Sequence, residues 1–319
     1  MQAKLEELKK EIEQLSLLKS QVSFDNNRLI IILETDSQNK NLLDKLKARI
    51  EQLVKEKYHF ANNSVVFTNK LEISSNKKNI EGVKKIIAVA SGKGGVGKSS
   101  VAANLAVALA KQGYRVGLAD LDIHGPSIAK IFGLSKKPDI KDNKIIPFIK
   151  YGVKVLSMAM LVDEGSALIW RGPMVSKAVS QLMVQASWDD CDYLILDLPP
   201  GTGDIHLTVF STYNVSGVVL VSTPQQVALI DVKRALEMLR KLEVPVLGVI
   251  ENMSFFEVAG KKLFPFGNGN VQVFCKKEGV AFFGEIPLIT EISELQDLGI
   301  PYCYKRSNKE IERALLKIC

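Results

Sequence analysis

The chain has 319 residues, of which 46% are hydrophobic and 24% charged, with 22 glycines and 11 prolines, and this composition excludes a disordered or collagen-like protein. The formal net charge of +7 is spread along the chain, with +4 in residues 1–85 and +3 in the remainder, so no basic stripe favours a nucleic-acid partner. The longest apolar runs have the length of strands, and none reaches the roughly 18 residues of a membrane-spanning helix.

The first 72 residues are predicted to form a small domain. Apolar residues recur there at helical spacing in two stretches, and two short apolar runs have the length of strands. The expected elements, in chain order, are a helix over 1–20, a strand over 29–33, a helix over 43–53 and a strand over 65–67. A coiled coil is the alternative, but neither stretch sustains the three or four heptads that a coiled coil needs. We therefore expect an α-β-α-β accessory domain over residues 1–72 and a polar linker over 73–83.

From residue 84 to 319 the sequence changes to apolar strands that alternate with helix-forming stretches. KIIAVA, VGLAD, LILDL, GVVLVST and VLGVIEN are the strand candidates. This alternation predicts an α/β domain with a doubly wound, mainly parallel sheet and helices on both faces. In such a sheet, ligands bind outside the carboxyl ends of the strands.

The first strand of this domain runs into SGKGGVGKSS, which precedes a helix-forming run. Glycine-rich loops between a strand and a helix let backbone N–H groups surround phosphate oxygens. Lys98 is expected to reach the β- and γ-phosphates of ATP, and the Ser99 hydroxyl to ligand Mg²⁺. The residues expected to contact the nucleotide in this loop are Gly92, Lys93, Gly94, Gly95, Val96, Gly97, Lys98, Ser99 and Ser100. We expect Lys98→Ala to abolish turnover and leave the fold intact.

Three carboxylates at strand ends complete the predicted site. VGLADLD ends in Asp120 and Asp122, and we expect Asp122 to orient the attacking water while Asp120 helps to hold that water or the metal. One of these two carboxylates could instead cap the following turn. Asp197 ends the strand CDYLILD in the manner of a Walker B aspartate, and we expect it to act on Mg²⁺ through the metal's water shell. The turn LPPGTGD after it is a candidate γ-phosphate sensor.

Lys93 makes the loop GKGGVGKS resemble the deviant P-loop of the ParA/MinD ATPase superfamily. GKGGVGKSS, DLDIHGPS, WRGPMVSKAV, DLPPGTGD, STPQQVALIDVKRA and ENMS together resemble the Mrp/ApbC family over residues 84–302. The resemblance implies an ATPase that forms a homodimer, with Lys93 reaching the partner's nucleotide, and that delivers iron–sulfur clusters to apo-proteins or assembly factors. It also implies that Asn252 recognises adenine, which a side-chain amide can do by donating and accepting.

The sequence departs from this family in its cysteines. Members that bind a bridging cluster have a CxxC after ENMS, whereas this chain has FFEVAGKK, so a [4Fe–4S] cluster lacks its usual ligands. The cysteines are Cys191, Cys275, Cys303 and Cys319, and we expect each to be structural. Their spacing and the absence of an apolar signal at the N-terminus predict a cytoplasmic protein without disulfides. We place His124 and His206 around the nucleotide pocket.

Two other functions remain open. A positioning ATPase like MinD or ParA would bind membrane or DNA, and the last helix has Ile311, Leu315 and Leu316 among charges. A cluster-free, nucleotide-dependent interaction module is the second, because the cysteine pair is missing. The leading hypothesis is an ATP-hydrolysing carrier of iron–sulfur clusters.

Overall fold

The computed structural model describes residues 2–18, 20–25, 28–35, 37, 40–60, 62–68, 77–123, 125, 127–161 and 172–318. Contacts divide the chain into two compact units, Met1–Ile73 and Ser74–Cys319, and each is described by itself. Among the described residues, no helix combines the length and the apolar character needed to cross a bilayer.

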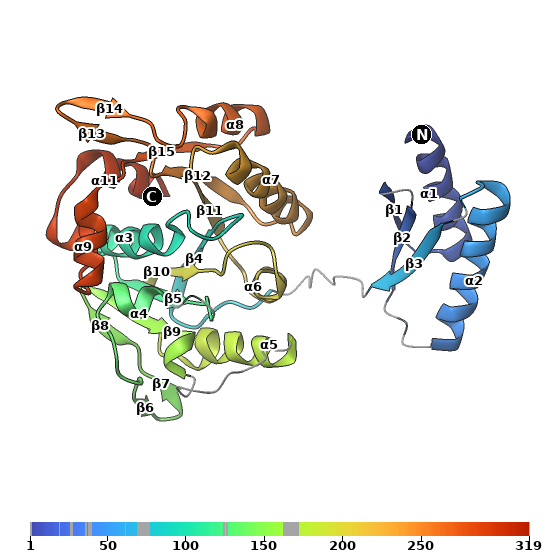
Figure 1. Ribbon diagram of the computed structural model, residues 1–319. Coiled ribbons are helices and arrows are strands. Elements are labelled where there is room, and N and C mark those ends of the chain that lie inside the picture. The colour runs from blue at the N-terminus through green and yellow to red at the C-terminus, as the bar shows by residue number, and fades with distance from the viewer. Residues whose placement is uncertain are drawn as a thin grey trace. The chain divides into compact units, whose positions relative to one another are not determined.

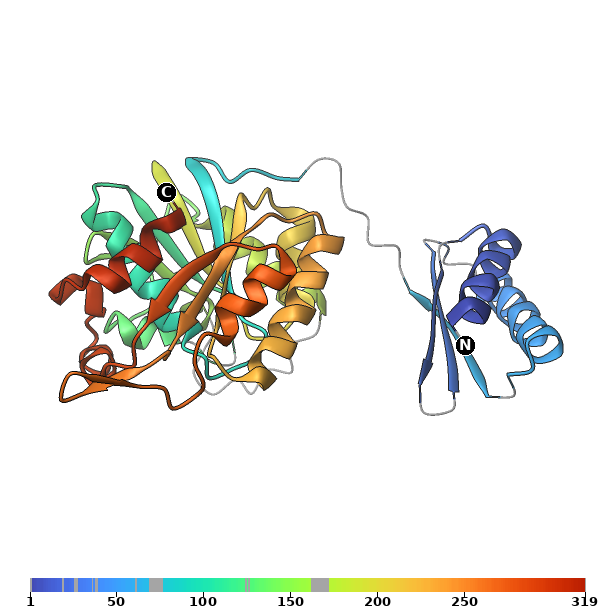
Figure 2. The same cartoon turned by 90° about the horizontal axis from the view of Figure 1, so that it is seen from above.

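The first unit is a three-stranded sheet with two helices packed on one of its sides (Figures 1 and 2). Its elements are α1 (Gln2–Ser16), β1 (Ser20–Asp25), β2 (Arg28–Glu34), α2 (Lys40–Lys57) and β3 (Asn63–Thr68). The sheet order is β1-β2-β3, with β1 antiparallel and β3 parallel to β2. Leu8 and Ile12 of α1 and Ile50 of α2 are fully buried against the sheet, as their helical spacing predicts.

Strand β1 is absent from the predicted α-β-α-β order, and this part of the prediction is wrong. Its sequence, SQVSFD, alternates polar and apolar residues over a length too short to stand out. It is nevertheless paired along its whole length with β2, which contributes a continuous apolar run. The order in the structure is therefore α-β-β-α-β.

The second unit is built around an eight-stranded sheet in the order β15-β12-β11-β4-β10-β5-β9-β8. Every neighbouring pair is parallel except β8 and β9. The strands are β4 (Val83–Ala90), β5 (Val116–Asp120), β8 (Phe148–Lys150), β9 (Val153–Ser157), β10 (Cys191–Asp197), β11 (Gly217–Ser222), β12 (Val246–Asn252) and β15 (Phe282–Ile286). Two small hairpins accompany the sheet: β6 (Ile140–Lys141) with β7 (Lys144–Ile145), and β13 (Phe256–Val258) with β14 (Lys261–Leu263).

Helices cover both faces of this sheet (Figure 1), and each face has its own hydrophobic core. One face carries α5 (Gly172–Ser180), the π-helical turn Gln181–Gln185, α6 (Asp204–Thr212), α7 (Gln226–Lys241) and α8 (Asn270–Glu278). The other carries α3 (Lys98–Lys111), α4 (Ser127–Ile131), α9 (Thr290–Asp297), α10 (Tyr302–Lys305) and α11 (Lys309–Leu315). Short 3-10 turns lie at Met158–Leu161 and Leu316–Ile318. This is the doubly wound α/β architecture that the alternating sequence predicts.

Part of the segment expected to be a linker belongs to the second unit. Lys78 bonds through its backbone to Thr212 and Asn214, and Ile80 is buried in the core beneath α6. Residues 78–82 thus lead directly into β4 at Val83. Ile80 is the apolar residue that attaches this otherwise polar segment to the core of the second unit.

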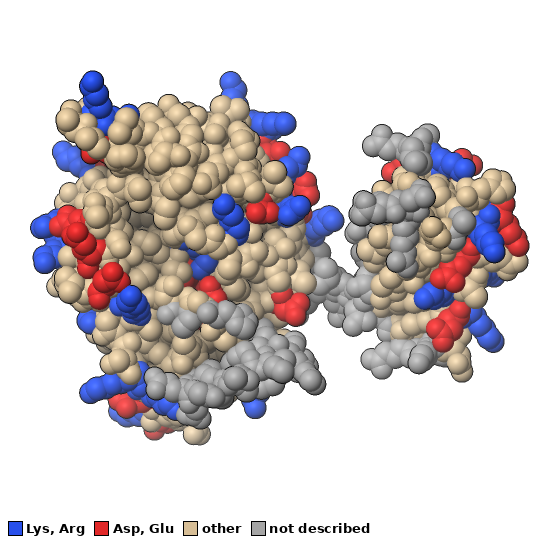
Figure 3. Space-filling view, in the orientation of Figure 1, with Lys and Arg blue, Asp and Glu red and all other residues tan. Residues whose placement is uncertain are grey.

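On the face of the second unit seen in Figure 3, lysines and arginines are interspersed with aspartates and glutamates. No one-signed field covers that face, which agrees with the even distribution of charge along the sequence.

Candidate functional site

The loop between β4 and α3 lies at the carboxyl edge of the sheet, and its glycines have separate reasons to be glycine. Gly95 and Gly97 have φ of +80° and +82°, a conformation that side chains disfavour. A Cβ at Gly97 would lie 2.2 Å from Nδ2 of Asn252, and one at Gly92 would lie 2.3 Å from the backbone of Asp231. The loop is therefore pressed against β12 on one side and α7 on the other.

Lys98 begins α3 and forms a buried ion pair beneath the loop. Its Nζ lies 2.5 Å from Oδ1 of Asp197, and the exposed fractions of the two side chains are 6% and 0%. Lys98 also donates to Oγ of Ser99 over 3.2 Å. Burial raises the pKa of Asp197, and the adjacent Lys98 charge opposes that rise. Oδ2 of Asp197 is buried and has no hydrogen-bond partner among the described residues.

The strand register brings Asp120 next to Asp197, because these residues are direct partners in the β5–β10 pair. Asp120 Oδ1 accepts from the backbone N–H of Asp122 over 3.0 Å, and Oδ2 accepts from the Ser157 hydroxyl over 3.0 Å. Burial, followed by the charge of Asp197, raises the pKa of Asp120 to about 8. Asp120 is thus a buried support for the next turn.

Asp122 lies closer to solvent than Asp120 and lines the cavity in front of the loop. Its Oδ1 accepts from the N–H of Gly125 over 3.0 Å, so it closes the turn after β5. His124 of the same turn lies outside the described residues.

Two adjacent cavities flank the loop. The larger, of about 860 Å³, is lined by the loop, Asp122, the prolines after β10 and residues of α4 and α9. The predicted residues that line it are Lys93, Gly94, Gly95, Gly97, Lys98, Ser99, Ser100 and Asp122. Four others, namely Gly92, Val96, Asp120 and Asp197, do not line it.

The smaller cavity has a volume of about 250 Å³ and a more apolar lining than the larger one. Its lining includes Asn252, Met253 and residues 286–289. Gly97, Ser100 and Gln296 border both cavities, which therefore adjoin. Asn252 donates from Nδ2 to the carbonyl of Val96 over 2.8 Å. Its amide oxygen has no such bond to the loop, so a ligand in this cavity can use it as an acceptor.

Two features of α4 and α9 were not predicted from the sequence. Gln296 donates to the Ser100 hydroxyl over 2.5 Å, and Asp297 forms an ion pair with Lys130 over 2.8 Å at the cavity rim. Gln296 and Ser100 are 196 residues apart, so only the fold brings them together. No motif in the sequence predicts the contact between Gln296 and Ser100.

Lys93 lies at the start of the loop and donates from Nζ to Oε1 of Gln225 over 3.2 Å. Gln225 directly precedes α7, on which Val227 and Ile230 expose 58% and 56% of their surface. The lysine is therefore held at the start of α7 and is not part of the buried pair beneath the loop.

The turn after β10 is tied to the loop, since the N–H of Gly201 donates to the carbonyl of Ser91 over 2.9 Å. His206 follows on α6 and is buried, with both ring nitrogens unpartnered among the described residues. Burial, followed by the Lys98 charge, lowers the pKa of His206 to about 4, so the ring is neutral at pH 7. His206 lines neither of the two cavities.

The three described cysteines do not converge. Cys191, Cys275 and Cys303 are each buried, and burial raises their pKa values to about 11, 12 and 12. Among the described residues, no group of three or more histidine, cysteine or acidic side chains could hold a metal. Cys319 and the first two residues of the WRGPMVSKAV motif, Trp170 and Arg171, lie outside the described residues, whereas the rest of that motif belongs to α5.

Comparisons with known proteins agree with this geometry. The family model described as ParA, NUBPL iron-transfer P-loop NTPase, matches residues 82–319. The chain is 47% identical over 247 residues to an iron-sulfur cluster carrier protein of Aquifex aeolicus, covering 76% of this chain and 68% of that protein. It is 42% identical over 247 residues to the iron-sulfur cluster transfer protein NUBPL of Mus musculus, covering 76% and 77%.

Among solved structures, a nucleotide-binding protein from Archaeoglobus fulgidus in complex with ADP matches with a TM-score of 0.63 and 36% identity, covering 72% of this chain and 91% of that one. The cell division ATPase MinD of Pyrococcus furiosus has the same fold, with a TM-score of 0.56 and 24% identity over 74% of this chain and 98% of that one. The glycine loop between β4 and α3, the buried lysine–aspartate pair and a family model that matches residues 82–319 converge on one assignment. The chain belongs to the NUBPL iron-transfer P-loop NTPases of the ParA group.

Proposed function

We propose that this protein binds and hydrolyses ATP with Mg²⁺ and uses the nucleotide to carry iron–sulfur clusters to apo-proteins. The observation that carries the nucleotide part is the buried Lys98–Asp197 pair beneath the glycine loop. A lysine in this position meets the β- and γ-phosphates of a nucleotide in the larger cavity, and backbone N–H groups of the loop bind the same oxygens.

The residues present fit a magnesium ion. Ser99 offers a hydroxyl oxygen at the start of α3, and Asp197 has a buried carboxylate oxygen with no partner in the described part of the chain. Hard cations prefer such oxygen ligands. A magnesium ion held by these residues would neutralise the charge that develops on the phosphates. Asp122, on the cavity wall, holds and orients the attacking water, while Asp120 fixes the backbone that carries Asp122.

ATP is the proposed nucleotide because the smaller cavity suits adenine. It places the Asn252 amide among mainly apolar side chains beside the loop. The neighbour from Archaeoglobus fulgidus is described as bound to ADP. Comparing the hydrolysis of ATP and GTP tests this choice, and equal kcat/KM values would argue against it.

We propose a homodimer in which Lys93 acts on the partner's nucleotide. Lys93 is held at the cavity edge by one hydrogen bond to Gln225, next to the exposed Val227 and Ile230 of α7. A second cation at the transferred phosphate would stabilise its charge. Measuring the mass in solution with and without a slowly hydrolysed ATP analogue tests the dimer, and Lys93→Ala should lower turnover more than nucleotide affinity.

For the cargo, the relatives described as carriers support a role in cluster transfer. The described cysteines of this chain are buried and apart, so we propose that ligands from a partner or from the receiving protein complete the coordination. The test is iron and acid-labile sulfide content after anaerobic reconstitution, with transfer to an apo-ferredoxin, for the wild type and for a variant lacking all four cysteines.

Cysteine-dependent iron that reaches the apo-ferredoxin would support the carrier function. Intact ATP hydrolysis without iron, alone or with the acceptor, would instead favour a nucleotide-dependent interaction module. That second function is favoured by one observation, the burial and raised pKa values of the three described thiols.

A further inference from the structure

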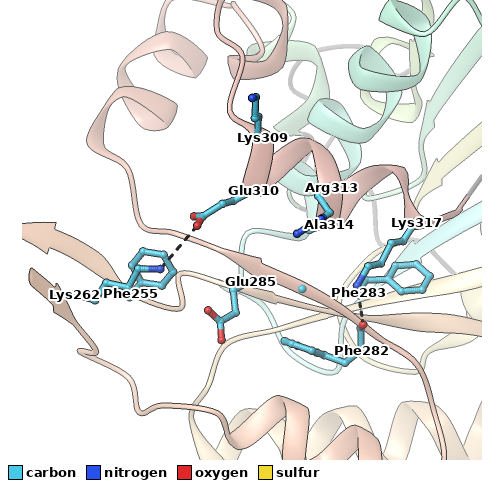
Figure 4. A pocket seen from close by; sticks show the side chains of 11 residues that line it. Phe255, Lys262, Phe282, Phe283, Glu285, Lys309, Glu310, Arg313, Ala314 and Lys317 are labelled. Carbon is cyan, nitrogen blue, oxygen red and sulfur yellow. Dashed lines mark hydrogen bonds and ion pairs between the residues drawn. The ribbon is translucent and has the colours of Figure 1, made fainter. Parts of the chain in front are cut away.

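A second large cavity lies at the edge of the sheet, on a different part of the unit from the P-loop. It has a volume of about 550 Å³ and is lined by residues 282–285 of β15, Lys262 of β14, and Lys309, Arg313 and Lys317 from α11 and the turn after it. We call it the β15 groove. Figure 4 shows α11 lying along β15, with the β13–β14 hairpin at one end of the groove.

The groove follows the open edge of the sheet. β15 is the terminal strand of the sheet, and among the described strands it pairs with β12 alone. The carbonyl of Phe282 accepts a hydrogen bond from Lys317 Nζ over 3.3 Å (Figure 4). A lysine amine thus stands where a neighbouring strand would supply a backbone N–H, so an extended chain can replace it.

The side chains around this edge combine positive charge with aromatic rings. Lys262 and Glu310 form an ion pair over 3.9 Å, and Lys262 lies 3.7 Å from the centroid of the Phe255 ring. Lys309 and Arg313 are exposed, and no charge partner for either is found among the described residues. Of the acidic residues that line the groove, Glu310 is already paired and Glu285 remains. An occupant with negative side chains would find two unpaired cations.

We propose that the β15 groove binds an extended acidic segment of a partner protein, which adds to the edge of β15 and pairs its carboxylates with Lys309 and Arg313. Backbone hydrogen bonds to β15 would supply affinity, and the cations with the phenylalanine rings would select acidic and apolar side chains in alternation. This interaction does not depend on the proposed ATPase and carrier function, since no nucleotide-site residue lines the groove.

The test uses the full chain and a fluorescein-labelled octapeptide that alternates valine with glutamate. Its affinity is measured by fluorescence anisotropy for the wild type, for Lys309→Glu with Arg313→Glu, and for Lys241→Glu with Lys277→Glu. The last variant makes the same change in net charge on α7 and α8, away from the groove lining. We expect the groove variant to weaken binding roughly tenfold or more and the control variant to change it less than about twofold.

Two further peptides identify the mode of binding. An octapeptide with lysine in place of glutamate should fail to bind, and one N-methylated at alternate residues should lose most of its affinity, because it cannot pair with a strand. Lys309→Gln with Arg313→Gln should give an intermediate affinity and guards against a loss of folding in the charge-reversed protein. Equal affinity of wild type and groove variant, or of the glutamate and lysine peptides, would overturn the proposal. Competition by an oligothymidylate as strong as that by the peptide would make the surface a general polyanion site and would also overturn it.

Discussion

The P-loop edge and the β13–β14 hairpin both lie next to the end of β12, but they differ in how far their side chains are buried. At the P-loop edge, charged side chains are buried and bonded to one another, as in the Lys98–Asp197 pair. The hairpin instead exposes its residues, with Val258 and Leu263 about half exposed and Lys262 above the ring of Phe255. It occupies the segment in which the family resemblance predicts a cysteine pair.

This difference indicates that the P-loop edge constrains its side chains more tightly than the hairpin does. The nucleotide site depends on a closed set of contacts, and a single changed side chain leaves a charge or polar atom buried without its partner. The hairpin is a short two-stranded element at the sheet edge, so its residues can change with little effect on the core. Four experiments test whether the two regions differ in this way.

The largest effect should come from Lys98→Ala. We expect turnover to fall about 100-fold or more, because the phosphate charge loses its cation. The sequence suggests that the fold would be unaffected, but the structure changes that expectation. Removal of Lys98 leaves Asp197 buried without a counter-ion, at a cost of about 3–5 kcal/mol in unfolding free energy.

Phosphate release and chemical denaturation measure the two effects separately. Lys98→Met combined with Asp197→Asn should regain stability without regaining activity. Lys130→Ala, at the exposed rim of the same cavity, is the matched control and should keep most of the turnover. Normal hydrolysis by Lys98→Ala would remove the nucleotide assignment.

The hairpin can be tested by installing the missing thiols. Val258→Cys with Lys261→Cys puts a CxxC across the turn, at positions that are direct partners in the hairpin. If two chains share one [4Fe–4S] cluster, reconstitution should add about two iron atoms per chain. Glu257→Cys with Lys262→Cys is the control, because these partners point to the other face of the hairpin. Equal iron in both variants would show that the hairpin is not a position for a cluster.

Gly97→Ala should have a smaller effect that tests the contact between the loop and β12. Both the φ of +82° and the 2.2 Å approach of Asn252 oppose a side chain here. Gly113→Ala is the control, since Gly113 has a φ of +89° but nothing within 4 Å of its Cβ position. Both variants should lose about 1 kcal/mol from the backbone conformation, and only Gly97→Ala should also weaken ATP binding, by about tenfold. Unchanged affinity, measured by titration calorimetry, would mean that the loop tolerates separation from β12.

The last effect is a pH dependence of stability at Asp120. Burial raises the pKa of Asp120 to about 8 in the folded protein, from the ordinary 3.8 of an aspartate, so the folded state binds this proton more tightly than the unfolded state. The associated stability is complete below about pH 4 and is lost as the pH rises towards 8, by at most about 1.4 kcal/mol per pH unit. Asp120→Asn should remove this slope, so its free energy of unfolding should rise relative to that of the wild type as the pH rises.

Denaturation between pH 4 and 9 measures the slope. Asp192→Asn should change the pH dependence of stability in the opposite direction, because hydrogen bonds from Arg115 hold the pKa of the Asp192 carboxyl below its usual range. That variant should lose stability relative to the wild type above about pH 4. Parallel curves for Asp120→Asn and the wild type would contradict the burial argument.

The sequence predicts the parts of the molecule that depend on local pattern. The glycine loop, its strand and helix, and the acids that end β5 and β10 follow from the spacing of apolar residues and the conformational needs of glycine. Strand β1 escapes prediction because it is short and half polar, and gains its stability from pairing with β2. Gln296 and Lys130 escape because their place at the cavity follows from the packing of α9 on α4. The Lys98–Asp197 bond joins two predicted residues, but its burial appears only in the fold.

The hydrogen bond from Asn252 to the carbonyl of Val96 has a consequence for selectivity. In the proposed function, the side chain that meets the base also holds the loop that binds the phosphates. A base that draws this amide away from Val96 shifts the loop, so the wrong nucleotide would be bound with its phosphates out of register. Discrimination between bases should then be expressed in kcat as well as in KM, because the penalty falls on the geometry of the transition state.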